Sequence, residues 1–134
     1  MKFSPSRGTA VVNDRSILLR RDRAAAPALR ALFPSLAQLR IELRFDGSSG
    51  TLPVPQTHVL HPPARAFFAF PCPYADCDGQ FDLAAAVSAA LGAPSLRIDG
   101  LLECAGQRAG GGASRRPCRL HLHYTITATR MPVA

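Results

Sequence analysis

Alternation of hydrophobic and polar residues is strictest between Gln38 and Asp46. Side chains two residues apart on a strand point to the same side of a sheet, so this segment predicts a strand with one apolar and one charged face. The apolar face holds Leu39, Ile41, Leu43 and Phe45, and the opposite face holds Arg40, Glu42, Arg44 and Asp46.

Four further segments are predicted to be strands. Thr57 to Leu60 lies among prolines and fits at most a short edge strand. The apolar run of Arg65 to Pro71 is interpreted as a strand buried on both sides. Leu96 to about Ala105 and Cys118 to about Thr129 are interpreted as an antiparallel hairpin, whose long Gly- and Arg-rich loop around residues 110–112 forms a flexible tip.

Two short helices are expected. Pro27 suits a first helical turn, and Leu29, Leu32 and Phe33 recur at helical spacing before Pro34. The second helix runs from Leu83 to Leu91, with Asp82 before it as a cap and Gly92 after it as a terminator. The predicted fold class is therefore α+β, with a mainly antiparallel sheet of four to five strands. Residues 1–23 are expected to form a loosely ordered arm or an edge strand, and residues 24–134 one domain.

Length and composition indicate the size and the cellular compartment of the protein more than its function. A chain of 134 residues with 47% hydrophobic residues can bury a core as one domain. No apolar run approaches the roughly 18 residues that would span a membrane, and the first 23 residues lack the compact apolar segment of a secretory signal. We therefore expect a soluble, cytoplasmic protein with no membrane partner. Disulfides are rare in the reducing cytoplasm.

The four cysteines carry the most specific chemical signal. Cys72 and Cys77 form C-x4-C on a segment stiffened by prolines, whereas Cys104 and Cys118 are separated by 13 intervening residues on the two predicted hairpin strands. Counting in steps of two from Cys104, Cys118 and Cys72 reaches the apolar face of each strand, so these three sulfurs are expected to point inward. Four thiolates around one point suit tetrahedral Zn²⁺.

This arrangement resembles zinc-ribbon and zinc-knuckle architecture over about residues 71–124, without matching a named family. The resemblance implies a structural zinc ion held by Cys72, Cys77, Cys104 and Cys118 that pins the knuckle to the hairpin. Its second ligand pair departs from the usual C-x2-4-C spacing. Buried structural thiols, two disulfides, or a redox pair are the alternative interpretations of the same cysteines.

Other residues allow weaker hypotheses. His121 and His123 share the polar face of the last strand, where a second metal could bridge them, although an exposed polar face is the simpler interpretation. The aromatic segment with Phe67, Phe68 and Phe70 could stack RNA bases, but core packing explains it better. Asp76, Asp78 and Asp82 are assigned to turning or capping the chain.

Function is expected to be binding. No nucleophile-elbow, zinc-protease, phosphate-loop or dinucleotide motif is present, and a site closed by four cysteines leaves no open position for catalysis. The first hypothesis is a non-enzymatic protein-interaction or self-assembly module that presents Arg119, His121, His123, Thr125 and Thr127. The second is a nucleic-acid binder, because the formal net charge is +7 and phosphate contacts could come from Arg20, Arg21, Arg23, Arg115, Arg116 and Arg119. The third is a thiol redox or metal-handling protein.

Overall fold

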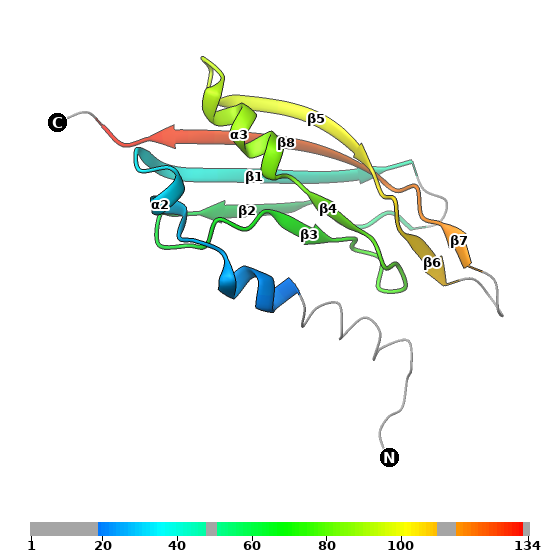
Figure 1. The fold of residues 1–134 in the computed structure, drawn as a ribbon. Coiled ribbons are helices and arrows are strands. Elements are labelled where there is room, and N and C mark those ends of the chain that lie inside the picture. The colour runs from blue at the N-terminus through cyan, green and yellow to red at the C-terminus, as the bar shows by residue number, and fades with distance from the viewer. Residues whose placement is uncertain (1–18, 48–50, 110–114, 133–134) are drawn as a thin grey trace.

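The fold is built around a four-stranded antiparallel sheet in the order β2-β1-β8-β5 (Figure 1). The computed structural model describes residues 19–47, 51–109 and 115–132. The strongly alternating segment forms β1 at the centre of the sheet, where it pairs with the last strand along its length. The four strands are β1 (Leu36–Asp46), β2 (Gln56–Leu60), β5 (Arg97–Glu103) and β8 (His121–Arg130).

One face of this sheet forms the core. The short hairpin of β3 (Ala69–Pro71) and β4 (Gln80–Asp82) and the helix α3 (Ala84–Gly92) lie over that face (Figure 1). Phe81 of β4 contacts Phe45 of β1, with ring centroids 6.4 Å apart. The predicted apolar face of β1 is confirmed, because its four side chains are all buried. Burial of these aliphatic and aromatic side chains supplies the main driving force for the fold.

The opposite face of the sheet is polar. On β8 it presents His121, His123, Thr125 and Thr127, as predicted. In the strand register each of them stands opposite a charged residue of β1, and all but His123, which stands opposite Leu101, also stand opposite a charged residue of β5. Arg119 precedes the strand, because its backbone has a positive φ of 55° that interrupts strand geometry.

The fold class is the predicted one: an α+β chain with an antiparallel four-stranded sheet and small additional sheets. α3 lies one residue later than expected, with Leu83 at its N-cap. The Asp82 carboxylate accepts a hydrogen bond from the Ala84 N–H at 2.9 Å, in keeping with a role at the helix start. Within the described residues, no helix has the length and apolar character needed to cross a bilayer.

The N-terminal helices differ in detail from the prediction. Residues 19–25 are helical, so the part of the expected arm or edge strand that the structure describes is not a strand; residues 1–18 lie outside the described residues. Arg and Ala, which dominate this segment, are good helix formers. The helix predicted to start at Pro27 is present as α2 (Leu29–Leu32). It is shorter than expected because Ala28 forms a β-bridge with Arg65. Leu32 is exposed.

Two strand predictions need correction. The segment Arg65 to Pro71 was expected to be a strand buried on both sides, but only β3 is a strand and its residues are partly exposed. A backbone hydrogen bond from Phe67 to Arg65 turns the preceding chain. The predicted hairpin of β5 and β8 is present, and it continues past Cys104 and Cys118 as β6 (Gln107–Ala109) paired with β7 (Arg115–Pro117). The predicted flexible tip at residues 110–112 lies outside the described residues.

Candidate metal centre

Two short turns of the same form face each other at the point where the β5–β8 hairpin changes direction. Each has the sequence Cys-x-Gly: residues 77–79 on the loop between β3 and β4, and residues 104–106 between β5 and β6. In both turns the glycine N–H points to the cysteine Sγ two residues earlier, at 3.3 Å for Gly79 and 3.4 Å for Gly106. Such N–H groups stabilise negative charge on sulfur.

The other two cysteines are fixed to the same turns by the backbone. The Cys72 N–H donates to the Gly79 carbonyl at 3.0 Å, and the Cys118 N–H donates to the Gly106 carbonyl at 3.0 Å. Each turn therefore contains one cysteine in its own sequence and holds a second cysteine, from the neighbouring segment, by a backbone hydrogen bond. The four cysteines form two equivalent pairs, Cys72 with Cys77 and Cys118 with Cys104.

The turns pack glycine against glycine. A Cβ placed on Gly106 would lie 2.5 Å from the Gly79 Cα, and a Cβ on Gly79 would lie 2.5 Å from the Cys104 Sγ. Only glycine allows the two turns to approach this closely. This pairing was not predicted, although the repeated Cys-x-Gly spacing is a visible signal in the sequence.

The loop that holds Cys77 is docked along β6 by backbone contacts. Cys77 forms an isolated antiparallel bridge with Arg108. On either side of it the Asp78 N–H donates to the Gln107 carbonyl at 3.2 Å, and the Ala109 N–H donates to the Asp76 carbonyl at 3.1 Å. The two hairpins are thus joined beside the cysteines.

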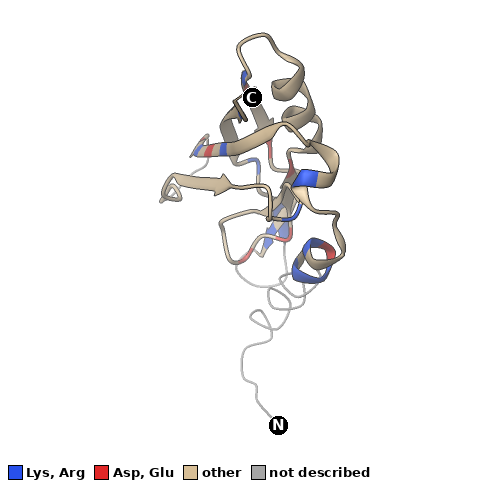
Figure 2. Cartoon of the chain, turned by 90° about the vertical axis from the view of Figure 1, so that its left-hand side faces the viewer, with Lys and Arg blue, Asp and Glu red and all other residues tan. Residues whose placement is uncertain are grey.

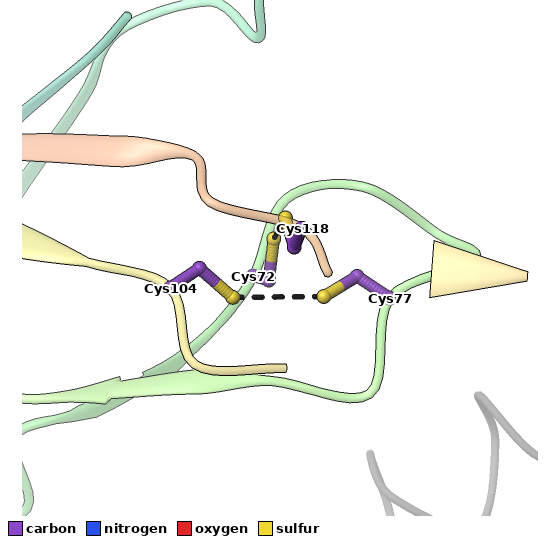
Figure 3. Close-up of side chains that lie close together, drawn as sticks. All are labelled: Cys72, Cys77, Cys104 and Cys118. Atoms are coloured by element: carbon purple, nitrogen blue, oxygen red, sulfur yellow. Dashed lines mark hydrogen bonds between the residues drawn. The ribbon is translucent and has the colours of Figure 1, made fainter. Parts of the chain in front are cut away.

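Figure 3 shows the four cysteine side chains gathered from three segments of the chain, with the sulfurs of Cys77 and Cys104 pointing toward each other. The Sγ atoms of Cys72 and Cys118 are 3.8 Å apart, those of Cys77 and Cys104 are 3.6 Å apart, and all four lie within 4.8 Å of one another. Four sulfurs bound tetrahedrally at about 2.3 Å from one Zn²⁺ would stand about 3.8 Å apart. The cluster therefore has the dimensions of a four-thiolate metal site.

None of the four cysteines is in a disulfide bond, and at most 5% of any of them is exposed. The contacts of 3.6 and 3.8 Å are far longer than the roughly 2.05 Å of a disulfide bond. Moreover, the closest sulfur contacts join Cys72 to Cys118 and Cys77 to Cys104. These are not the sequence-adjacent pairs from which a local disulfide would be expected.

Burial dominates the acid–base chemistry of the cluster. It raises the pKa of Cys72 far above its ordinary value, against the effect of a backbone hydrogen bond from Tyr74, and the neighbouring sulfurs raise it further. Burial likewise raises the pKa of Cys104 to about 12. Four thiols this close cannot all ionise without a counter-charge, and a divalent cation supplies one. The metal-free cluster is therefore expected to hold protons that a metal would displace.

Charged side chains reinforce the docking of the loop. The Arg108 guanidinium lies 3.8 Å from the centre of the Tyr74 ring and donates to the Asp76 carboxylate at 3.1 Å. Arg115 donates to the Asp78 carboxylate at 2.8 Å, and the other carboxylate oxygen of Asp78 accepts from the Gln107 N–H at 2.7 Å. These two aspartates fasten the loop to the second hairpin, which is a more specific use than the predicted turn formation.

The arginines proposed for nucleic-acid binding fall into two separate groups. Residues 20, 21 and 23 lie on the helix 19–25 below the β3–β4 hairpin, and residues 115, 116 and 119 lie on and after β7 at the end of the long hairpin (Figure 1). In Figure 2 the helix of residues 19–25 is mostly blue, whereas blue and red segments lie side by side along a strand elsewhere in the fold. Arg23 covers the Phe67 ring at 5.4 Å.

The remaining candidates take structural positions. Phe68 is buried in the core and the partly buried Phe70 packs against it, which confirms core packing for these two residues, whereas Phe67 is partly exposed. His121 lies between Asp46 at 3.5 Å and Glu103 at 3.3 Å, and His123 lies 2.7 Å from Asp46. Among the described residues, the four cysteines form the one group with metal-ligand spacing.

Comparisons with known proteins gave no match for this chain. No family model matches the sequence, and neither the curated proteins nor the solved structures contain a significant match.

Proposed function

We propose that the four cysteines bind one structural Zn²⁺ ion and that the protein is a non-enzymatic binding module stabilised by this ion. The observation that supports the zinc ion is the buried four-sulfur cluster, with closest separations of 3.6 and 3.8 Å. Zn²⁺ prefers four tetrahedral thiolates in structural sites. Its binding free energy adds directly to folding when the free chain has no preformed site.

Zinc at this position would join two hairpins of the fold. Cys72 and Cys77 belong to the β3–β4 hairpin, while Cys104 and Cys118 belong to the long hairpin of β5 to β8. Four metal bonds across this junction would fix one hairpin against the other. Four protein ligands would also close the coordination sphere, which supports a structural role over a catalytic one.

The test of the zinc ion is native mass spectrometry of freshly purified protein, with and without a chelator, beside a thermal melt of each sample. One zinc per chain and a much lower melting temperature after chelation are expected. A metal-free mass with four thiols would overturn the zinc site, and a mass four protons lighter would indicate two disulfides.

The binding role rests on the polar outer face of the sheet. This face carries mixed charges, including Arg44, and histidines that are about one-third exposed, and in the described chain it has no covering element. Mixed charge on a rigid sheet suits recognition of a complementary protein surface. Separation of the basic residues into two groups gives nucleic acid less support, because a phosphate backbone is usually followed by a continuous basic surface. Burial of all four thiols likewise gives a redox role less support.

A partner-capture experiment tests the binding role. Immobilised protein is compared with Arg44→Glu, which changes the outer face, and with Arg30→Glu, a matched control on α2 away from that face. A partner that survives nuclease treatment and is lost only with Arg44→Glu would support the role. Capture that disappears with nuclease would favour the nucleic-acid alternative, and equal capture by all three proteins would refute the use of this face.

A further inference from the structure

The edge strand β5 has the features of a self-pairing surface. In the described chain β5 ends the sheet, with β8 on one side and no strand on the other. The opposite edge strand, β2, is protected against strand addition by Pro55 immediately before it and Pro62 just after it. β5 contains no proline, and its outward residues alternate regularly with partly buried ones.

The open hydrogen-bonding groups of β5 can be assigned from its pairing with β8. The Cys104 N–H donates to the Leu120 carbonyl, and the Ala128 N–H donates to the Leu96 carbonyl, each at 2.8 Å. In an antiparallel pair, successive residues direct their N–H and C=O groups alternately toward and away from the partner. The even-numbered residues of β5 therefore face β8. The groups that point to the open edge belong to Arg97, Asp99, Leu101 and Glu103, and of these the Arg97 carbonyl accepts a hydrogen bond from the Ser95 hydroxyl at 3.4 Å.

We infer that two copies of this chain associate by antiparallel pairing of their β5 strands, in the register centred on Gly100. In that register Arg97 of each copy stands opposite Glu103 of the other, twice across the interface, so opposite charges meet. Leu101, which is 56% exposed in one copy, approaches its counterpart diagonally across the two-fold axis. All four outward residues of each strand then form backbone hydrogen bonds, and the two sheets join into one of eight strands.

Neighbouring registers are disfavoured by charge. Hydrogen bonding requires the outward residues to pair with one another, so the register can shift only in steps that keep odd numbers opposite odd numbers. A shift in one direction places Asp99 opposite Asp99 of the second copy, and a shift in the other places Asp99 opposite Glu103 twice. Like charges directly opposite each other are destabilising. The register centred on Gly100 is thus the one that pairs all four outward residues of each strand without placing like charges opposite each other.

Gly100 suits the centre of this interface. It would face its own counterpart as a non-hydrogen-bonded pair, in which backbones approach most closely. The Tyr124 ring from β8 lies against Gly100 and occupies the space where a side chain would project. The central pair of the interface would therefore carry no side chains of its own on the core face of the sheet. Pairing of this kind uses the edge of β5 and a second copy of the chain, whereas the binding role proposed above uses the outer face of the sheet and a different protein.

The test is a charge swap between separate proteins, followed by sedimentation velocity over a concentration series. Arg97→Glu and Glu103→Arg are each expected to weaken self-association at least tenfold, because each single change replaces two attractive pairs with repulsive ones. A one-to-one mixture of the two variants should restore the dimer, since every charge then faces its opposite. Arg30→Glu, an equivalent charge reversal on α2 and outside β5, is the matched control and should dimerise normally.

Zinc content and thermal melts of each variant show whether the fold is intact, so that loss of the dimer is not confused with unfolding. A zinc-loaded wild-type protein that stays monomeric at all concentrations would overturn the inference without affecting the proposed zinc site. Dimerisation of both charge-reversal variants with the wild-type affinity would also overturn this interface. So would a mixture of the two folded variants that fails to associate.

Discussion

Replacement of Gly106 by alanine should separate the two Cys-x-Gly turns and weaken metal binding. The added Cβ would lie 2.5 Å from the Gly79 Cα, whereas ordinary van der Waals contact begins near 3.4 Å. Both atoms are fixed to the backbone, so the turns must move apart by about 1 Å to relieve the overlap. Gly106 also positions Cys104 and Cys118 through its N–H and carbonyl groups. The displacement therefore reaches the sulfurs directly.

Overpacking of a close contact destabilises by about 1–3 kcal/mol, which corresponds to roughly 5- to 150-fold in zinc affinity if the metal-bound state carries the strain. The affinity is measured by competition with a chromophoric chelator. Gly92→Ala is the matched control, because a Cβ there meets nothing within 4 Å and the residue ends a helix. Alanine at that position should leave zinc affinity unchanged. Gly106→Ala with wild-type affinity would refute the argument that glycine contact sets the sulfur geometry.

Three further predictions follow from the same cluster. Cys77→Ser and Cys104→Ser should each unfold or aggregate, since loss of one ligand removes several kcal/mol of metal-linked folding free energy; a soluble, cooperatively melting variant would contradict this. Alkylation should spare all four cysteines in the native protein and label them after chelation, because each is at most 5% exposed, and mass spectrometry counts the labels. The metal-free protein should lose stability as the pH rises above about 9. There the unfolded thiols ionise while Cys72 and Cys104, whose pKa values burial raises, stay protonated in the fold. The loss is about 1.4 kcal/mol per pH unit for each thiol. Melts between pH 7.5 and 10.5 should show this decline without metal and a flatter profile with zinc.

Local patterns predicted the parts of the fold that depend on local residues. The alternation in β1 is a direct consequence of one face packing on the core, so it could be seen without any knowledge of neighbours. The start and stop signals of α3 located it to within one residue. The inward direction of Cys104 and Cys118 also followed from the phase of nearby apolar residues, although the strand does not run through Arg119.

Features that depend on distant contacts could not be predicted in the same way. β1 lies beside β8, about 80 residues later in the chain, and no local pattern specifies that pairing. The extension of the hairpin into β6 and β7 depends on the loop from Asp76 to Asp78 docking along it. The shortness of β3 likewise reflects a turn at Phe67 that the continuous apolar run concealed. The aspartates that fasten the loop were identified only as turn residues.

The pairing of the sulfurs is the most instructive difference. Sequence spacing groups Cys72 with Cys77, and Cys104 with Cys118. In space the closest contacts cross between these groups, because the two Cys-x-Gly turns face each other. The repeated glycine two residues after a cysteine was the available signal, since a turn with an N–H directed at sulfur needs little space at that position.

X-ray absorption spectroscopy at the zinc edge of the freshly purified protein tests the central claim most directly. Four equivalent sulfur neighbours at about 2.3 Å, with no nitrogen or oxygen in the first shell, are expected if Cys72, Cys77, Cys104 and Cys118 close the coordination sphere. A protein without zinc, or one whose zinc is bound by nitrogen and oxygen atoms, would contradict the four-cysteine site.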